Sequence, residues 1–310
     1  GAARRVAAGL PRNACRGRCN PDAGMSPSMV STQASIADLI RSPAGWAAPT
    51  ATPQYSIVTL VSNHAQYDAM RASFEAGGFG RAGCEYLYID NSDYNAADAY
   101  AGLNALLNRA RAPYVLLCHQ DLMLIGDGRA ELDERLADLD ARDANWALAG
   151  NAGGVAPGKL ALRISDPHAS DVRVGTLPAR VTSLDENFIV VRRDARLGFS
   201  RDLAGFHFYG ADICMHAAQM GYSAYVINFH LKHLSAGRKS ADFHEMELAF
   251  QAKWARALAP RWIQTTCALL RLSGAPVGGM IGRLARVPLQ KVVRRLPGAQ
   301  GWTPSARKPV

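Results

Sequence analysis

Residues 55–90 read YSIVTLVSNHAQYDAMRASFEAGGFGRAGCEYLYID, and this stretch decides the fold. Two runs rich in β-branched and aromatic residues, YSIVTLVS and CEYLYID, flank a segment with helical periodicity, AMRASFEAGG. A second helical segment, AADAYAGLNALLNRA, and a third apolar run, PYVLLC, follow. The order strand, helix, strand, helix, strand is typical of a doubly wound parallel sheet, so we predict an α/β fold.

The alternation continues along the chain and is interrupted once. Helical patterns occur in ELDERLADLDARD, ADICMHAAQMG and DFHEMELAFQAKWARALA. Apolar runs occur in NWALAGN, NFIVVRR and SAYVINFHLKH, and we predict one strand over each of them. Residues 151–180 are rich in Gly and Pro, so we predict an insertion near the binding site there, with loop side chains that select the ligands. We place one folded domain at residues 55–258.

The charge of the 310-residue chain is unevenly distributed. Its net charge is +9, but residues 55–247 carry −6, whereas residues 248–310 hold eleven Lys and Arg and no acid. A nucleic-acid-binding module is expected to have a basic face on its folded core, so we predict no nucleic-acid partner. A basic, nucleic-acid-associated protein is the weaker alternative.

The two ends of the chain differ from the central domain. Residues 1–54 lack apolar periodicity and predict a disordered or loosely attached segment. Met25 and Met29 support the hypothesis that translation begins at one of them, which would exclude residues 1–24 from the native protein. Residues 259–310 form a basic tail with interleaved apolar residues. This tail either lies on an anionic membrane surface or has no partner.

Cysteine usage and hydropathy favour the cytoplasm. The only close pair among the six Cys residues, Cys15 and Cys19, has no second pair at zinc spacing, so we predict free thiols in a reducing compartment. No apolar run approaches the roughly 18 residues of a membrane span. The Arg-bearing start lacks the apolar core of a signal peptide. Peripheral contact with the inner membrane face is compatible with this location.

Polar side chains follow three of the predicted strands. Ligands of parallel α/β sheets bind beyond the carboxyl ends of the strands, which makes these residues donor-binding candidates. Asp121 stands out, because LMLI rather than a helix follows it, and a carboxylate between apolar runs needs a cation, a hydroxyl or a metal. For Ser62 and Asn91, helix capping remains an alternative. The six candidates are Ser62, Asn63, Asp90, Asn91, His119 and Asp121.

Residues 55–235 resemble the nucleotide-sugar-dependent glycosyltransferases of family 2, and in particular their bacterial capsule and surface-polysaccharide branch. The similar segments occur in the family's order: YIDNSD, LNALLNRARAPYVLLCHQD, FYGADICMHAAQMG and HLKHLSAG. The resemblance implies the GT-A fold, a Rossmann-like, mostly parallel sheet flanked by helices. It also implies an inverting, hexosyltransferase-like enzyme with a nucleotide-diphosphate sugar donor and a glycan or lipid-linked glycan acceptor.

The resemblance implies a metal as well. In the family's pattern, Asp90 contacts the nucleotide base and Asp121 binds Mn²⁺ or Mg²⁺, which neutralises the departing diphosphate. His119 replaces the first Asp of the family's Asp-x-Asp, which either favours Mn²⁺ or removes one ligand. Residues three apart in a strand point to opposite faces, so only one of His230 and His233 should reach the metal. We favour His233, which lies nearer the strand end.

The segment FYGAD is similar to the family's Tyr-Gly-Glu-Asp motif, with Ala211 in place of Glu. The resemblance makes Asp212 the general base that takes the proton of the acceptor hydroxyl. The alternative is an acid that only complements the helix dipole. Residues predicted on the acceptor side are Asp185, Glu186, His207 and Tyr209, although packing explains His207 and Tyr209 equally well.

Two other classes of protein compete with this enzyme as interpretations of the sequence. The replacement of the first Asp and of the Glu at 211 favours a catalytically inactive GT-A relative that binds nucleotide or glycan, and this is the main alternative. A Rossmann dehydrogenase is disfavoured, because SNHAQYD rather than Gly-x-Gly-x-x-Gly follows the first predicted strand.

Overall fold

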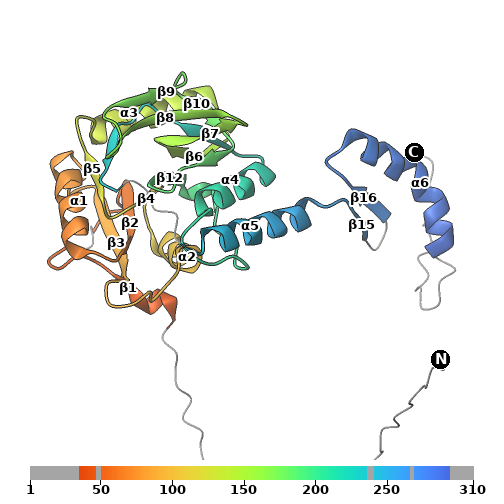
Figure 1. The fold of residues 1–310 in the computed structure, drawn as a ribbon, viewed down its shortest axis with the longest axis horizontal. Coiled ribbons are helices and arrows are strands. Elements are labelled where there is room, and N and C mark those ends of the chain that lie inside the picture. The colour runs from red at the N-terminus through yellow and green to blue at the C-terminus, as the bar shows by residue number, and fades with distance from the viewer. Residues whose placement is uncertain (1–34, 47–49, 236–240, 266–268, 294–310) are drawn as a thin grey trace, which may run out of the picture. The chain divides into compact units, whose positions relative to one another are not determined.

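The computed structural model describes residues 35–46, 50–235, 241–265 and 269–293 (Figure 1). The helices are α1 (His64–Ala76), α2 (Ala99–Arg109), α3 (Arg129–Arg142), α4 (Tyr209–Gln219), α5 (Phe243–Leu258) and α6 (Pro276–Val293), with 3-10 turns η1 (Ile36–Leu39) and η2 (Arg193–Ala195). The strands of the central sheet are β1 (Ile40–Arg41), β2 (Tyr55–Val61), β3 (Cys84–Asp90), β4 (Tyr114–Cys118), β6 (Trp146–Gly150), β10 (Ala179–Val181), β12 (Phe188–Arg192) and β13 (Ser223–Val226). The other strands are β5 (Leu122–Leu124), β7 (Ala152–Ala156), β8 (Lys159–Ser165), β9 (Val172–Val174), β11 (Ser183–Leu184), β14 (Leu231–His233), β15 (Arg261–Gln264) and β16 (Leu269–Leu272).

The central sheet has the strand order β1-β3-β2-β4-β12-β6-β13-β10. β2 lies between β3 and β4 and is parallel to both, so β2-α1-β3-α2-β4 forms the predicted doubly wound unit. β12 is antiparallel to β4 and to β6, and β13 is parallel to β6. The sheet is therefore mixed: β3, β2 and β4 are parallel, and antiparallel strands occur in the rest of it. This architecture confirms the predicted α/β class and is the arrangement that the GT-A resemblance implies.

Helices cover both faces of the central sheet (Figure 1). One core contains Leu103 of α2 and Ile213 of α4, and the other contains Phe74 of α1 and Leu136 of α3. Every residue of β2 except Leu60 is buried, because side chains on both faces of this strand meet a helix layer. This double burial explains why the strand reads as a nearly continuous apolar run.

A second sheet has the order β11-β7-β8-β14-β5, with β9 paired to β8. The irregular stretch 151–180 contributes β7, β8 and β9 to it. The prediction of one strand over SAYVINFHLKH is wrong, because β13 belongs to the central sheet and β14 to the second sheet. The four residues 227–230 carry the chain from one sheet to the other.

Residues 35–46 pack onto the domain, in contrast to the loose attachment predicted for residues 1–54. β1 pairs with β3 through Ile40 and Ile89. Trp46 is buried, with its ring centroid 4.7 Å from that of Tyr86. The apolar residues of this segment are too few to show a periodicity, so the sequence did not reveal the contact. Residues 1–34, with Met25, Met29 and both cysteines of the close pair, lie outside the described residues.

The described residues following the central sheets comprise α5, the antiparallel hairpin β15–β16 and α6. No helix among the described residues is both long and apolar enough to cross a membrane. Cys84, Cys118 and Cys214 are buried free thiols. Cys267 lies outside the described residues.

Candidate functional site

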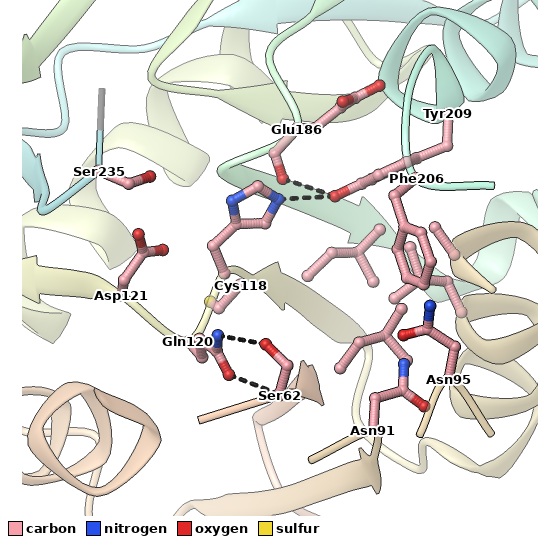
Figure 2. Close-up of a pocket in the computed structure, with 15 residues that line it drawn as sticks. Ser62, Asn91, Asn95, Cys118, Gln120, Asp121, Glu186, Phe206, Tyr209 and Ser235 are labelled. Carbon is pink, nitrogen blue, oxygen red and sulfur yellow. Dashed lines mark hydrogen bonds between the residues drawn. The ribbon is translucent and has the colours of Figure 1, made fainter. Parts of the chain in front are cut away.

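A cavity of about 410 Å³ lies at the carboxyl ends of β2 and β4, and its size is within the range of small-molecule sites. Figure 2 shows the side chains around it. This edge of the sheet is where a doubly wound fold is expected to bind its ligands. The lining residues are Leu60, Ser62, Asn91, Asn95, Ala99, Leu103, Leu117, Cys118, His119, Gln120, Asp121, Glu186, Phe206, Tyr209 and Ser235.

Asp121 lies in the turn between β4 and β5. β5 pairs with β14 so that His233 is opposite Leu122, and Nε2 of His233 lies 3.2 Å from Oδ1 of Asp121. Burial alone would raise the pKa of Asp121, but the hydrogen bond and charge of His233 lower it to about 2. Burial would lower the pKa of His233, but the hydrogen bond to Asp121 outweighs burial and raises this pKa. Asp121 is therefore ionised at neutral pH.

His119 lies next to this pair, and its two ring nitrogens face His233 and Tyr209. Its Nδ1 lies 3.4 Å from Nε2 of His233, and its Nε2 lies 2.9 Å from the Tyr209 hydroxyl. That hydroxyl donates to the backbone oxygen of Glu186 at 3.1 Å, so it accepts from the Nε2–H of His119. Burial and the nearby His233 lower the pKa of His119, which favours its neutral form. Nδ1 of His119 therefore keeps a lone pair on the side of His233.

The three side chains form a cluster that fits a divalent metal. His119, Asp121 and His233 each offer one ligand atom, and these atoms all lie within 4.8 Å of one another. Imidazole nitrogens and a carboxylate suit divalent transition ions. A hydrogen bond to the second ring nitrogen, as Tyr209 provides for His119, commonly orients metal-binding histidines. His119 is thus placed to supply a ligand in the position where the family has its first Asp.

His230, the competing histidine, lies outside this cluster. Its Nε2 is 2.9 Å from Oγ of Ser165, and its backbone N–H donates to Asp127 at 2.7 Å. His230 precedes β14 and His233 ends that strand. The structure therefore brings the favoured histidine, His233, next to Asp121.

Gln120 connects the ends of β2 and β4, and the sequence reasoning missed it. Its Oε1 accepts from the backbone N–H of Ser62 at 2.7 Å, and its Nε2 donates to Oγ of Ser62 at 2.8 Å (Figure 2). The same Oε1 also accepts from the backbone N–H of Asn63 at 2.8 Å. Ser62 lines the cavity, but Asn63 does not. The Asn63 side chain accepts from the N–H of Gln66 and caps α1, a common role of Asn after a strand.

The end of β3 places Asn91 in the cavity wall and leaves Asp90 outside it. Asn91 is buried and bonds twice to the backbone of Ala97, so it holds the loop before α2 in place. The cap of α2 is Asp98, not Asn91. Asp90 is exposed and bonds to Ser92 and His64. The side-chain and backbone hydrogen bonds from Ser92 lower the pKa of Asp90.

Glu186 is the second acid that lines the cavity. Its side chain lies beside the start of α4 (Figure 2), where the N–H of Gly210 donates to Oε1 at 3.4 Å. Burial and the neighbouring Asp185 raise the pKa of Glu186 to about 8, although backbone N–H groups of α4 oppose this shift. Asp185 is not among the lining residues. Its Oδ1 accepts from the backbone N–H of Asn187 at 3.0 Å.

Asp212 does not reach the cavity, which corrects its prediction as the general base. Its carboxylate is fully buried and accepts from the Ser200 N–H at 2.8 Å, the Ser200 hydroxyl at 2.7 Å and Nε1–H of Trp254 at 3.0 Å. A general base must come within hydrogen-bonding distance of the hydroxyl that it deprotonates. Asp212 instead joins α4 to α5, and its place in the first turn also complements the α4 dipole.

The Asp212→Ala variant should lower the free energy of unfolding by about 3 kcal/mol or more, because buried donors lose a charged acceptor. Urea unfolding measures this loss. Asp138→Ala, which removes a half-buried acid of α3 that pairs with Arg142 at the surface, should change stability by less than about 0.5 kcal/mol. An Asp212→Ala protein with unchanged stability would show that the buried hydrogen bonds do not hold α4 and α5 together.

Of the two remaining residues predicted on the acceptor side, only one lies at the cavity. Tyr209 lines the cavity, whereas His207 packs against Phe243, with ring centroids 5.1 Å apart. None of residues 151–180 lines the cavity, but β8 of this insertion pairs with β14, the strand that ends at His233, so the insertion lies beside the cluster without forming the cavity wall. Lining residues that the sequence reasoning did not single out as site candidates include Asn95, Phe206 and Ser235. Only Ser235, in HLKHLSAG, stood in a recognised segment.

Fold and site define an α/β protein with a doubly wound parallel half-sheet and a His-Asp-His cluster at the ligand-binding edge of that sheet. No family model matches the chain. A protein of Fuscovulum blasticum named "ATP synthase subunits region ORF 6" is 34% identical over 231 residues, which cover 72% of this chain and 92% of that protein. The chain belongs to the family of this protein, whose name states no activity.

Solved structures with a similar arrangement are distant in sequence. A mannosyltransferase from Pyrobaculum calidifontis, in complex with GDP-Man and Mn²⁺, is 15% identical with a TM-score of 0.43, covering 67% of this chain and 66% of that one. S. aureus TarS 1–349, in complex with UDP-GlcNAc, is 12% identical with a TM-score of 0.44, covering 65% and 66%. The chain thus spans about two thirds of each. At these TM-scores neither structure decides a function.

Proposed function

We propose that this protein is an inverting, metal-dependent glycosyltransferase. It transfers a hexosyl group from a nucleotide-diphosphate sugar to a hydroxyl of a glycan or lipid-linked glycan, in the cytoplasm, during the synthesis of a surface polysaccharide. The observation that carries the proposal is the cluster of His119, Asp121 and His233. This cluster lies beside a cavity at the carboxyl ends of the parallel strands, which is where doubly wound sheets bind nucleotides.

The residues in and beside the cavity form two groups, one suited to the diphosphate of the donor and the other to its nucleoside. His233 does not line the cavity but adjoins Asp121, which does. His119, Asp121 and His233 would hold Mn²⁺ or Mg²⁺, and Asp121 contributes the negative charge because its pKa of about 2 keeps it ionised. When bound, the metal supplies a Lewis acid that neutralises the diphosphate leaving group. Ser62 and Asn95 offer hydroxyl and amide groups for the nucleoside, and Asn91, whose amide bonds to the backbone of Ala97, fixes the wall between them.

Glu186 replaces Asp212 as the proposed general base. Asp121 and Glu186 are the acids that line the cavity in the described part of the chain, and Asp121 serves the metal. A base works best when its pKa is near the working pH, and the pKa of Glu186 is about 8. Glu186 takes the proton of the acceptor hydroxyl, whose oxygen bonds to the anomeric carbon while the bond to the diphosphate breaks. Attack from the opposite face inverts the configuration.

A thermal-shift panel with UDP, GDP, dTDP and CMP, each with Mn²⁺, Mg²⁺ or EDTA, tests the donor class. One nucleoside diphosphate at about a hundred times its Kd should raise the melting temperature by about 5 °C, and only with a metal present. CMP serves as the monophosphate control. No shift with any nucleotide would contradict the proposal.

The same panel, combined with an assay of diphosphate release, distinguishes the proposed enzyme from the main alternative, a catalytically inactive relative. A metal-dependent shift without release of diphosphate from the matching nucleotide sugar would indicate a catalytically inactive relative. The burial of Asp212 and the Ala at 211 are the observations that favour this alternative.

A further inference from the structure

Helix α6 has an exposed apolar face. The large apolar residues at positions 277, 280, 281, 284 and 292 are between 51% and 73% exposed. At 3.6 residues per turn these positions fall within about a third of the helix circumference. The exposed Pro288 falls on the same side. An apolar stripe of this width normally packs against another apolar surface, yet here the side chains are open to solvent.

The β15–β16 hairpin before α6 also has exposed apolar side chains on one face. Ile263 lies opposite Leu270 in the β15–β16 pairing, and Leu272 lies two residues further on the same face. These three side chains are 38%, 41% and 48% exposed. On the other face, the Arg271 guanidinium lies 5.6 Å from the ring centroid of Trp262. The first face thus carries three exposed apolar side chains, with Arg261 opposite Leu272 at its edge.

The positive charge of residues 248–310 favours binding to an anionic surface. Residues 248–310 hold eleven Lys and Arg and no acid, whereas residues 55–247 carry −6. Within α6, positions 283 and 286 are Arg and fall outside the apolar third of the helix, whereas Lys291, in its last turn, falls inside that third. An anionic surface would therefore attract this region and repel the central domain.

We propose that α6 and the β15–β16 hairpin dock this protein on an anionic phospholipid membrane, with α6 lying in the plane of the surface. The apolar face enters the boundary between headgroups and acyl chains, and the basic residues meet the lipid phosphates. Docking takes the protein to a surface that carries lipid-linked acceptors. It goes beyond the proposed function and holds whether or not the cavity transfers a sugar.

Two other occupants of this surface fit the observations less well. A nucleic acid would use the positive charge but not the apolar face of α6. A second α6 helix would need a continuous apolar seam, and the helix contains Gly278, Gly279, Gly282 and an internal Pro288. A membrane surface accommodates both features, because it has no fixed side-chain positions to match.

Flotation of the full chain with phospholipid vesicles tests the docking. Binding should be at least about tenfold tighter to vesicles that mix phosphatidylcholine with phosphatidylglycerol than to phosphatidylcholine alone, and it should weaken as NaCl screens the charges. Leu284→Glu places an acid on the apolar face at a residue that is 73% exposed, and it should weaken binding about tenfold or more.

Leu160→Glu is the matched control, because Leu160 is 56% exposed on β8, outside the tail. It should bind vesicles as the wild type does, and both variants should keep the wild-type melting temperature because both residues are exposed. Equal binding to the two kinds of vesicle, or equal binding by Leu284→Glu and the wild type, would overturn the proposal. Tighter binding to a single-stranded oligonucleotide than to the anionic vesicles would overturn it in favour of a nucleic acid.

Discussion

Asp121→Ala should abolish the metal-dependent thermal shift with nucleoside diphosphates and lower donor turnover by about a thousandfold or more. Asp121 is the carboxylate of the cluster, and its removal leaves two imidazoles with no negative charge to hold a divalent cation. Calorimetric titration with Mn²⁺ measures the loss of metal affinity directly. Turnover is followed as the release of diphosphate from the donor that the nucleotide panel selects.

Two variants separate the loss of charge from the loss of shape. Asp121→Asn keeps the shape of the side chain and should lose most of the metal affinity. Asp138→Ala removes a half-buried acid of α3 outside the cavity and should behave as the wild type. If Asp121→Ala kept the metal-dependent shift, the cluster would not be the metal site, even if the nucleotide still bound in the cavity.

The sequence could predict the part of the fold that depends on local alternation. The runs from Tyr55 to Cys118 alternate between strand and helix patterns, and β2-α1-β3-α2-β4 follows them. Parallel strands bring their carboxyl ends to one edge, which is why Ser62, Asn91 and Asp121 lie around one cavity. Asp121 was recognisable because an apolar run follows it, and this run is β5.

Other features depend on partners that are distant in the sequence. The chain from Ser223 to His233 is apolar enough to read as one strand, and its pattern does not show that it changes from one sheet to the other. An Asp in the first turn of a helix has the same local sequence whether it faces a cavity or the core. Asp212 faces the core because Ser200 and Trp254, on other segments, supply its donors.

The role of His119 was undecided for the same reason. Its sequence position allowed either a metal ligand or the loss of one. The Tyr209 hydroxyl, 90 residues further along the chain, bonds its Nε2 and leaves Nδ1 toward His233. Gln120 was overlooked because its amide bonds to the end of another strand rather than to its own neighbours.

Glu186→Gln should lower the rate of diphosphate release from the donor, with water as the acceptor, by about 10²–10⁴-fold while leaving diphosphate affinity unchanged. The amide oxygen of Gln can still accept the Gly210 N–H, so α4 should start at the same residue and the melting temperature should stay close to that of the wild type. Asp212→Asn is the competing variant. It should lose stability but keep turnover at temperatures where it is folded.

The pH profile adds a measurement that a structural role of Glu186 would not change. Asp185 and the Tyr100 and Tyr209 hydroxyls face Glu186, and the pKa values of both tyrosines are raised, so the hydroxyls stay neutral. Because only the ionised carboxylate accepts a proton, the wild-type rate should rise with pH and level off above the Glu186 pKa of about 8. Glu186→Gln should lose this rise and Glu186→Asp should keep part of it. If Glu186→Gln kept the wild-type profile while Asp212→Asn lost it, the base would be Asp212, and the carboxylate that is buried in this structure would have to reach the cavity during catalysis.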